Sequence, residues 1–202
     1  MKVTRGFSGR LRNPEADRVP PGQYVTSEFP VLSAGPTPRT ALESWSLTLQ
    51  SGSQLLARWS WAEFEALPQT DLTTDIHCVT KWTKLGTRWR GVRFDDLMAA
   101  AGLSSPPFSY VMAHCDGGYT TNLPVADLLG GKGMIVSQFD GVPLPAVHGG
   151  PARLLVPHLY LWKSAKWVRS FVFMETNAPG FWESLGYHIY GDPWREQRYS
   201  GD

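Results

Sequence analysis

Short apolar stretches follow one another along this chain, and turn-forming residues such as Gly52, Pro68 and Gly102 end them. Several show the alternation of apolar and polar residues that is typical of half-buried strands, and helical periods are brief. No apolar run reaches the roughly 18 residues of a membrane-spanning helix. A chain of 202 residues is long enough to bury one substantial core. The pattern therefore predicts one compact α+β unit with mixed β-sheets and short peripheral helices.

Strands account for most of the expected elements. Trp45, Leu47 and Leu49 alternate with polar residues as far as Gly52, and the Asp140-Gly141 turn between two apolar runs predicts a hairpin. The expected strands are 45–51, 76–79, 110–113, 134–139, 142–144, 153–157 and 166–175. Ser60 followed by Glu63 is a capping-box pattern, so a short helix should begin there and end near Pro68. The other helical segments are expected at 94–101 and 124–129.

The first 40 residues contain many of the turn-forming residues and show neither helical nor strand period. We expect residues 1–40 to form an arm packed on a domain made of residues 41–202. The N-terminus has no apolar leader segment and no twin-arginine pair, which predicts a soluble, cytoplasmic protein.

Charge and cysteine content exclude several classes of function. Lys and Arg number 19 against 18 Asp and Glu, for a net charge of +1, so no overall field favours nucleic acid or an anionic membrane as partner. The two cysteines, Cys78 and Cys115, are too few for the disulfide framework of a small secreted domain. We expect both thiols to be reduced.

The segment HGGPARLLVPHLYLWKSAKW, residues 148–167, concentrates polar groups around one expected strand and the loop after it. Lys163, Ser164 and Lys166 could converge on one phosphate. The spacing matches neither a P-loop nor a dinucleotide-binding motif. The alternative is a solvated lysine-rich loop.

Two other segments have candidate chemistry. Cys78 precedes several cations that would favour a thiolate, but a buried cysteine is also a common small apolar residue. No Cys/His spacing suits zinc, and no local signature matches a cysteine protease. In HCDGGYTTNLP, Gly117 and Gly118 allow a sharp turn that presents Tyr119, although an ordinary turn with a buried tyrosine fits as well.

Taken together, DIHCVTKWT, GYTTNLP, DGVPLPAVHGGPARLLVPHLYLWKSAKWV and the terminal GYHIYGDPWREQRY resemble the sulfite oxidase superfamily of molybdopterin-dependent oxidoreductases. Short bacterial sulfite oxidase-like proteins are the nearer likeness, and the catalytic subunit of the molybdenum methionine sulfoxide reductase is a more distant one. The resemblance covers nearly the whole chain. It implies the sulfite oxidase-type molybdopterin-binding fold and a molybdenum-molybdopterin cofactor without a nucleotide.

The resemblance also implies a role for the lone cysteine. It makes Cys78 the metal ligand, because soft sulfur suits molybdenum beside the dithiolene sulfurs of the pterin. Tyr119 is then expected to donate a hydrogen bond near the metal-bound oxygen, with Lys81 and Trp82 at the substrate mouth. Trp89 is expected to help wall the pocket.

The remaining residues implied by the resemblance would bind the cofactor. The expected cofactor contacts, besides Cys78, are His77, His114, His148, Arg153, Lys163, Ser164, Ala165 and Lys166.

This chain lacks some of the cationic residues that sulfite oxidases have. Where those enzymes have arginines that bind the sulfite dianion, this chain has Trp82 and Thr83, and a further arginine matches Leu32. We therefore expect oxygen-atom transfer to or from an uncharged small molecule, such as an S-oxide or N-oxide, with electrons exchanged through a separate cytochrome or flavoprotein. The protein is expected to be a monomer without nucleic acid or membrane partners. The alternatives are a non-catalytic molybdopterin-binding or redox-sensing protein, and a metal-free enzyme with Cys78 as nucleophile.

Overall fold

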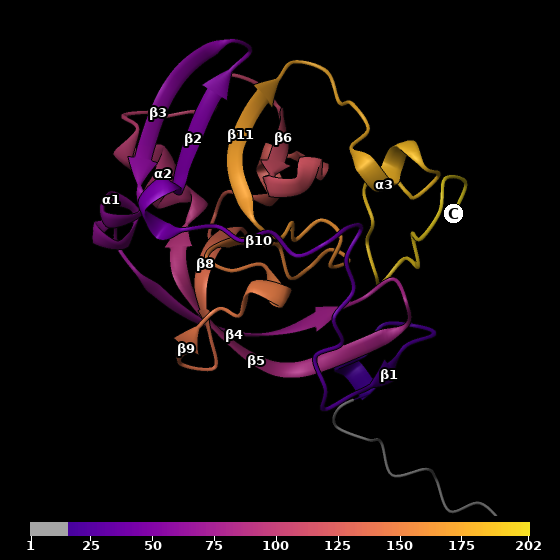
Figure 1. Ribbon diagram of the computed structural model, residues 1–202. Coiled ribbons are helices and arrows are strands. Elements are labelled where there is room, and N and C mark those ends of the chain that lie inside the picture. Colours follow the sequence, from indigo (N-terminus) through magenta and orange to yellow (C-terminus); the bar gives the residue numbers. More distant parts are fainter. Residues whose placement is uncertain (1–15) are drawn as a thin grey trace, which may run out of the picture.

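The computed structural model describes residues 16–202, and Figure 1 shows two β-sheets with short helices around them. Residues 1–15 of the expected arm lie outside the described residues. One sheet has six strands, which are β1 (Tyr24–Val25), β4 (Thr70–His77), β5 (Trp82–Arg93), β8 (Met134–Phe139), β9 (Val142–Pro143) and β10 (Arg153–Leu155). The other has five strands, which are β2 (Ser46–Ser51), β3 (Gln54–Ser60), β6 (Tyr110–Cys115), β7 (Thr120–Pro124) and β11 (Val168–Met174).

Both sheets are mixed. β1 pairs with β5, and β2 with β11, in parallel, while the other strand pairs are antiparallel. The order β3-β2-β11-β6-β7 places the last strand of the chain between β2 and β6. These features confirm the expected α+β class with mixed sheets.

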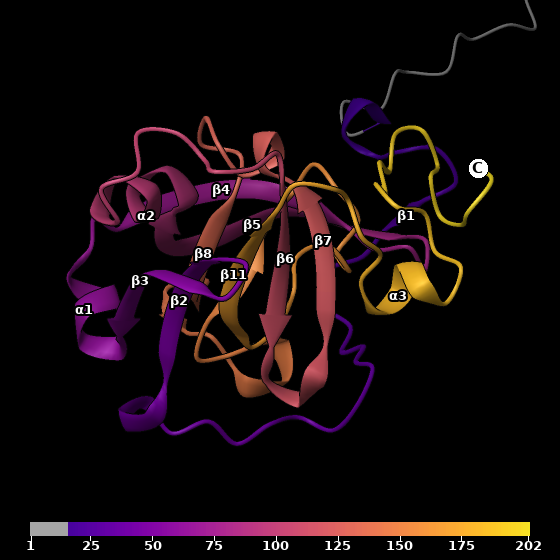
Figure 2. The same ribbon diagram turned by 90° about the horizontal axis from the view of Figure 1, so that it is seen from above.

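The helices are short and lie around the sheets, as Figures 1 and 2 show. α1 and α2 lie on one side of the molecule, and α3 lies with the C-terminal residues on the other. The α-helices are α1 (Trp61–Ala66), α2 (Phe94–Ala100) and α3 (Phe181–Ser184), and the 3-10 helices are η1 (Ala16–Arg18), η2 (Leu42–Ser44), η3 (Asp116–Gly118), η4 (Val125–Asp127) and η5 (Ala146–His148). The expected capping box is present at α1, where Ser60 Oγ accepts from the Glu63 amide and Glu63 accepts from the Ser60 amide. Within residues 16–202, the helices are all too short or too polar to cross a bilayer.

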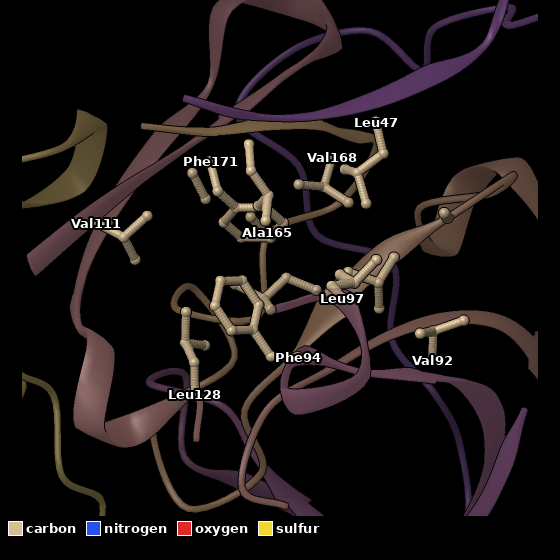
Figure 3. Packing of buried hydrophobic residues seen from close by; sticks show 14 of the residues in the cluster. Leu47, Val92, Phe94, Leu97, Val111, Leu128, Ala165, Val168 and Phe171 are labelled. Atoms are coloured by element: carbon tan, nitrogen blue, oxygen red, sulfur yellow. The ribbon is translucent and has the colours of Figure 1, made fainter. Parts of the chain in front are cut away.

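The main core fills the space between the sheets, as Figure 3 shows. Phe94 of α2 meets Phe171 of β11 edge to face, with ring centroids 5.1 Å apart. Each such side chain stabilises the fold by about 1.5–3 kcal/mol when fully buried. A second, smaller cluster beneath the six-stranded sheet includes Ile76, Cys78 and Trp82. Packing therefore fixes the ends of β4 and β5, between which Cys78 lies.

Some elements differ from the sequence prediction. The strand expected at 76–79 is the end of the longer β4, which stops at His77. The sequence pattern did not indicate β1, β3, β5, β7 or α3, and the helical segment expected at 124–129 is the 3-10 helix η4. β5 has inward positions occupied by Thr87 and Gly91, so its apolar alternation is weak. Gly91 is required there, because a Cβ atom would lie 2.1 Å from the Ile135 carbonyl oxygen of β8.

Candidate cofactor and active site

A tight turn between β4 and β5 presents Cys78. The Cys78 amide donates to the Trp82 carbonyl at 2.9 Å, and Lys81, with a φ of 73°, closes the turn. The Cys78 side chain is buried, and the Thr80 hydroxyl donates to its Sγ at 3.2 Å. Burial raises the pKa of this thiol. A cation or a metal beside it would favour the thiolate.

A cavity of about 340 Å³ opens beside Cys78. Its walls come from the N-terminal arm, the Cys78 turn, the loops that follow β6 and β10, and the segment around α3. The lining residues that matter below are Phe29, Leu32, Cys78, Trp82, Tyr119, Arg153, Leu161, Trp162, Ser164, Ala165, Lys166, Phe181, Trp182 and Tyr187.

Arg153, at the start of β10, lies in the wall of this cavity and is only 2% exposed. Its guanidinium donates to backbone carbonyls, with the His148 oxygen at 2.9 Å and the Ser164 oxygen at 2.6 Å. The ion pairs found within residues 16–202 do not include Arg153. Burial lowers its pKa to about 10. A buried cation without a carboxylate is suited to binding an anionic ligand.

Lys166 adds a second cation to the same wall. Its Nζ donates to the carbonyls of Leu32 and Val147, each at 2.7 Å. Burial, and then repulsion from Arg153, lower its pKa to about 8. Ser164 and Ala165 also line the cavity, and the Ser164 hydroxyl accepts from the Val156 amide at 2.8 Å. Lys166 joins the arm to the loop after β10, and its charge faces the same region as that of Arg153.

His148 lies beside this group but does not itself line the cavity. Its ring stacks on Phe29 of the arm, with centroids 3.9 Å apart and planes 6° from parallel. Its Nδ1 is buried and has no hydrogen-bond partner among the described residues. Burial, with repulsion from Lys166 and Arg153, lowers its pKa to about 4, so the imidazole is neutral at pH 7. A neutral ring with a free nitrogen can hydrogen-bond a heterocycle bound beside it.

Tyr119 and Trp82 form other parts of the wall. The Tyr119 hydroxyl donates to the Trp162 carbonyl at 2.6 Å, and burial and then Glu183 raise its pKa. The phenol is therefore protonated and able to donate. Trp82 packs edge to face on Phe29 at 6.2 Å. Lys81 is different, because its side chain is exposed and does not line the cavity.

Lys163 also does not line the cavity. Its Nζ forms an ion pair with Glu183 at 2.5 Å, and both side chains are only 1% exposed. It also donates to the carbonyl and Oδ1 of Asn122 and to the Ile189 carbonyl. Lys163 thus lies within three positions of Lys166 but points to a different part of the molecule, where its donors are already used.

Three further expected residues lie away from the cavity. His77 bonds through Nδ1 to the Thr83 hydroxyl at 3.0 Å and lines a separate hollow near Trp194. His114 is exposed on β6. Trp89 is buried in the smaller core cluster and donates to Thr87.

Several wall residues had no signal in the sequence. No role was expected for Phe29 of the arm or for Phe181 and Trp182 of α3. Leu32 was noted only as the match of a family arginine, and Tyr187 only as part of the terminal motif. Trp162 stood inside a motif but was not recognised as a wall. Chain folding alone brings these residues together.

The donor set of the site fits a cofactor that carries its own metal ligands. Within residues 16–202, no group of three or more His, Cys, Asp and Glu side chains could hold a metal ion. Cys78 is a single thiol, and Cys115 is a second free thiol buried in the main core. The unpaired cations Arg153 and Lys166 fit an anion beside that thiol. A molybdenum-bearing pterin with a phosphate group satisfies each of these requirements.

The fold and the site thus fit a protein that binds an anionic, metal-bearing cofactor. Comparison with known families agrees, because the sequence profile described as "Oxidoreductase molybdopterin binding domain" matches residues 34–182. The chain belongs to this family, in the sulfite oxidase-like superfamily, and is a molybdopterin-binding oxidoreductase.

Two relatives show what this chain is similar to. The oxidoreductase YuiH of Bacillus subtilis (strain 168), which is uncharacterized, is 41% identical over 97% of this chain and 99% of its own length. A protein of Azospira oryzae (strain ATCC BAA-33 / DSM 13638 / PS), provisionally assigned as the protein-methionine-sulfoxide reductase subunit YedZ1, is 31% identical over 66% of this chain and 50% of its own length.

A solved structure shares the fold. The sulfane dehydrogenase SoxCD from Paracoccus pantotrophus superposes with a TM-score of 0.60 at 19% identity, over 69% of this chain and 40% of that chain. At this level of identity the likeness concerns the fold alone.

Proposed function

We propose that this enzyme transfers an oxygen atom to or from a small uncharged molecule, such as an S-oxide or N-oxide, at molybdenum held by Cys78. The observation that carries the proposal is one unpaired thiol that shares a cavity with Arg153 and Lys166, two cations without carboxylate partners. When bound, molybdenum would supply two-electron chemistry between its IV and VI states, which serves the exchange of an oxygen atom.

The protein's own residues hold the cofactor in this proposal. Arg153 and Lys166 bind its anionic group, with Ser164 and Ala165 beside them, and His148 hydrogen-bonds the pterin edge. The pterin is bare in this proposal, because the two cations that line the cavity, Arg153 and Lys166, suit one anionic group. Lys163 is left out of this set because its Nζ already bonds Glu183 and Asn122.

The substrate is uncharged in this proposal. The cations of the cavity are committed to carbonyls and to the cofactor, and the wall positions Leu32 and Trp82 offer no charge to a dianion such as sulfite. The relative assigned as a methionine-sulfoxide reductase subunit supports an S-oxide substrate. The Tyr119 hydroxyl donates a hydrogen bond to the substrate oxygen after leaving the Trp162 carbonyl.

Electrons come from or go to a separate electron-transfer protein, a cytochrome or flavoprotein. In the reducing direction, one S-oxide, two protons and two electrons give one sulfide and one water. The word subunit in the name of the Azospira relative supports action with another protein.

Molybdenum content tests the proposal most directly. The protein is produced in a host that makes molybdopterin, and metal and pterin per chain are measured for wild type, Cys78→Ser and Cys115→Ser. Cys115→Ser is a matched control, since that thiol is also free and buried but lies in the main core. We expect near-stoichiometric metal in wild type and control, with altered metal spectroscopy only in Cys78→Ser. Wild type without molybdenum or pterin would refute the proposal.

A further inference from the structure

One carboxylate oxygen near the cavity accepts from three different side chains. Glu183 Oε1 accepts from Trp162 Nε1 at 2.9 Å and Thr121 Oγ1 at 3.1 Å, and pairs with Lys163 Nζ at 2.5 Å. Glu183 lies on α3, Thr121 on β7, and the other two in the loop after β10. The oxygen therefore joins three separate segments of the chain.

Trp162 is the member of this group that reaches the cavity wall, and its indole is fixed on several sides. It stacks on Tyr160 with centroids 5.2 Å apart, and Tyr187 meets it edge to face at 5.3 Å. A Cβ atom on Gly191 would lie 2.6 Å from its Cζ2 atom, so the backbone there packs directly on the ring. Together with the hydrogen bond to Glu183 Oε1, these contacts hold the ring in its observed orientation.

The position of Trp162 affects Tyr119 through the backbone carbonyl of Trp162. The Trp162 carbonyl accepts the Tyr119 hydroxyl at 2.6 Å. Phe181 and Trp182, the neighbours of Glu183 on α3, line the same cavity, and the Phe181 ring centroid lies 5.8 Å from that of Tyr119. A shift of Glu183 would therefore move both the acceptor of Tyr119 and the part of the wall that Phe181 and Trp182 form.

The buried pair is not explained by stability. Replacing a buried ion pair by apolar residues of similar volume is often neutral or stabilising. Glu183 Oε2 is buried and has no hydrogen-bond partner among the described residues, which adds to the cost of the carboxylate. The hydrogen bonds and the ion pair of Glu183 instead fix the positions of Trp162 and α3.

We propose that Glu183 is a positioning residue, which holds Trp162 and thereby directs the Tyr119 hydroxyl in the active site. The catalytic part of this inference rests on the proposed function. The positioning itself is a property of the chain and can be measured without the cofactor.

Two double variants separate the hydrogen bond from the charge. Both carry Lys163→Met, which removes the buried cation. Glu183→Gln in the first keeps an oxygen acceptor for Trp162, and Glu183→Leu in the second removes it. The comparison therefore isolates the acceptor, since the loss of the Lys163 donors is common to both.

The first readout is nuclear magnetic resonance of the cofactor-free protein with labelled tryptophan and tyrosine. Trp162→Phe and Tyr119→Phe assign the signals of the Trp162 indole N–H and the Tyr119 ring. We expect both signals to stay near their wild-type positions in the glutamine variant and to shift in the leucine variant. Unchanged signals in the leucine variant would overturn the inference.

The second readout is turnover of an S-oxide per bound molybdenum. We expect the leucine variant to lose on the order of tenfold to a hundredfold in kcat relative to the glutamine variant, with equal metal content. Equal kcat in fully loaded variants, despite shifted signals, would overturn the catalytic part. If wild type binds molybdenum but does not turn over S-oxides, the proposed substrate fails while the resonance result still decides the positioning of Tyr119.

Discussion

Lys163 and Lys166 come from the same short loop, yet their surroundings differ in charge. Lys163 has a carboxylate of its own in Glu183, with further oxygen acceptors around it. Lys166 and its neighbour Arg153 have only backbone carbonyls. The first site is electrically complete, and the second has a net positive charge that a bound anion can neutralise. Charge balance, more than burial, thus separates the structural cation from the candidate cofactor site.

The largest effect on stability should follow from breaking the ion pair between Lys163 and Glu183. Glu183→Leu alone leaves the Lys163 cation buried without a partner, so the free energy of unfolding should fall by about 3–5 kcal/mol. Urea denaturation of the cofactor-free protein measures the change. Adding Lys163→Met should recover most of the loss. If Glu183→Leu alone lost no more than about 0.5 kcal/mol, as an ordinary surface substitution does, the contrast drawn between Lys163 and Lys166 would be wrong.

At the site of Arg153 and Lys166, a substitution should affect cofactor binding more than stability. Arg153→Met removes a cation that has no carboxylate, so the stability of the cofactor-free protein should fall less than in Glu183→Leu. Cofactor retention should fall on the order of tenfold to a hundredfold, the worth of a lost charge-assisted hydrogen bond. Pterin and molybdenum per chain after dialysis measure this. Arg90→Met, which breaks an exposed pair with Asp71, is the control and should retain the wild-type content.

A smaller effect should appear with pH and inorganic phosphate. The pKa values of Lys163 and Lys166 are lowered to about 8 from 10.5, so the unfolded chain binds more protons between these pH values. The contribution of these two lysines to stability without an anion should therefore rise as pH increases from 8 towards 10.5. Above about pH 9 the thiols of Cys78 and Cys115 oppose this rise, because burial raises their pKa values. Phosphate stabilisation should follow the reverse course, because it needs charged Lys166 and fades above pH 8.

Thermal unfolding with and without phosphate, between pH 7 and pH 9.5, measures both trends. Lys166→Met should weaken the phosphate response, and its stability should lose the part of the pH dependence that Lys166 contributes. An equal phosphate shift in wild type and variant would mean that the anion binds elsewhere.

Local pattern predicted the fold well wherever it was regular. The capping box at Ser60 and the hairpin at Asp140-Gly141 depend on near neighbours in the sequence, and both are present. β5 was missed because Thr87 and Gly91 occupy inward positions, and only the close approach of β8 explains why Gly91 lies there.

The site could be predicted only in part for a related reason. The motif around Lys163 and Lys166 indicated a phosphate site, but spacing does not show which way each side chain of an irregular loop points. The acceptor of Lys163 lies 20 positions later, on α3, where Glu183 has no motif around it. Cys78 was singled out by its isolation in the sequence, and the structure places it in the same cavity as Arg153.

The smallest effect is expected at Lys81, the cation closest in sequence to Cys78. Its side chain is exposed and does not line the cavity, although its backbone closes the Cys78 turn with a positive φ. Lys81→Asn keeps a residue that tolerates this conformation, so the free energy of unfolding should change by no more than about 0.5 kcal/mol. Molybdenum content and the KM for an S-oxide should stay at wild-type values, in contrast to Trp82→Ala, which removes part of the wall. A severalfold rise in KM for Lys81→Asn would mean that a solvent-exposed cation also acts on the substrate. The functional cations would then not be limited to the buried residues Arg153 and Lys166 that line the cavity with Cys78.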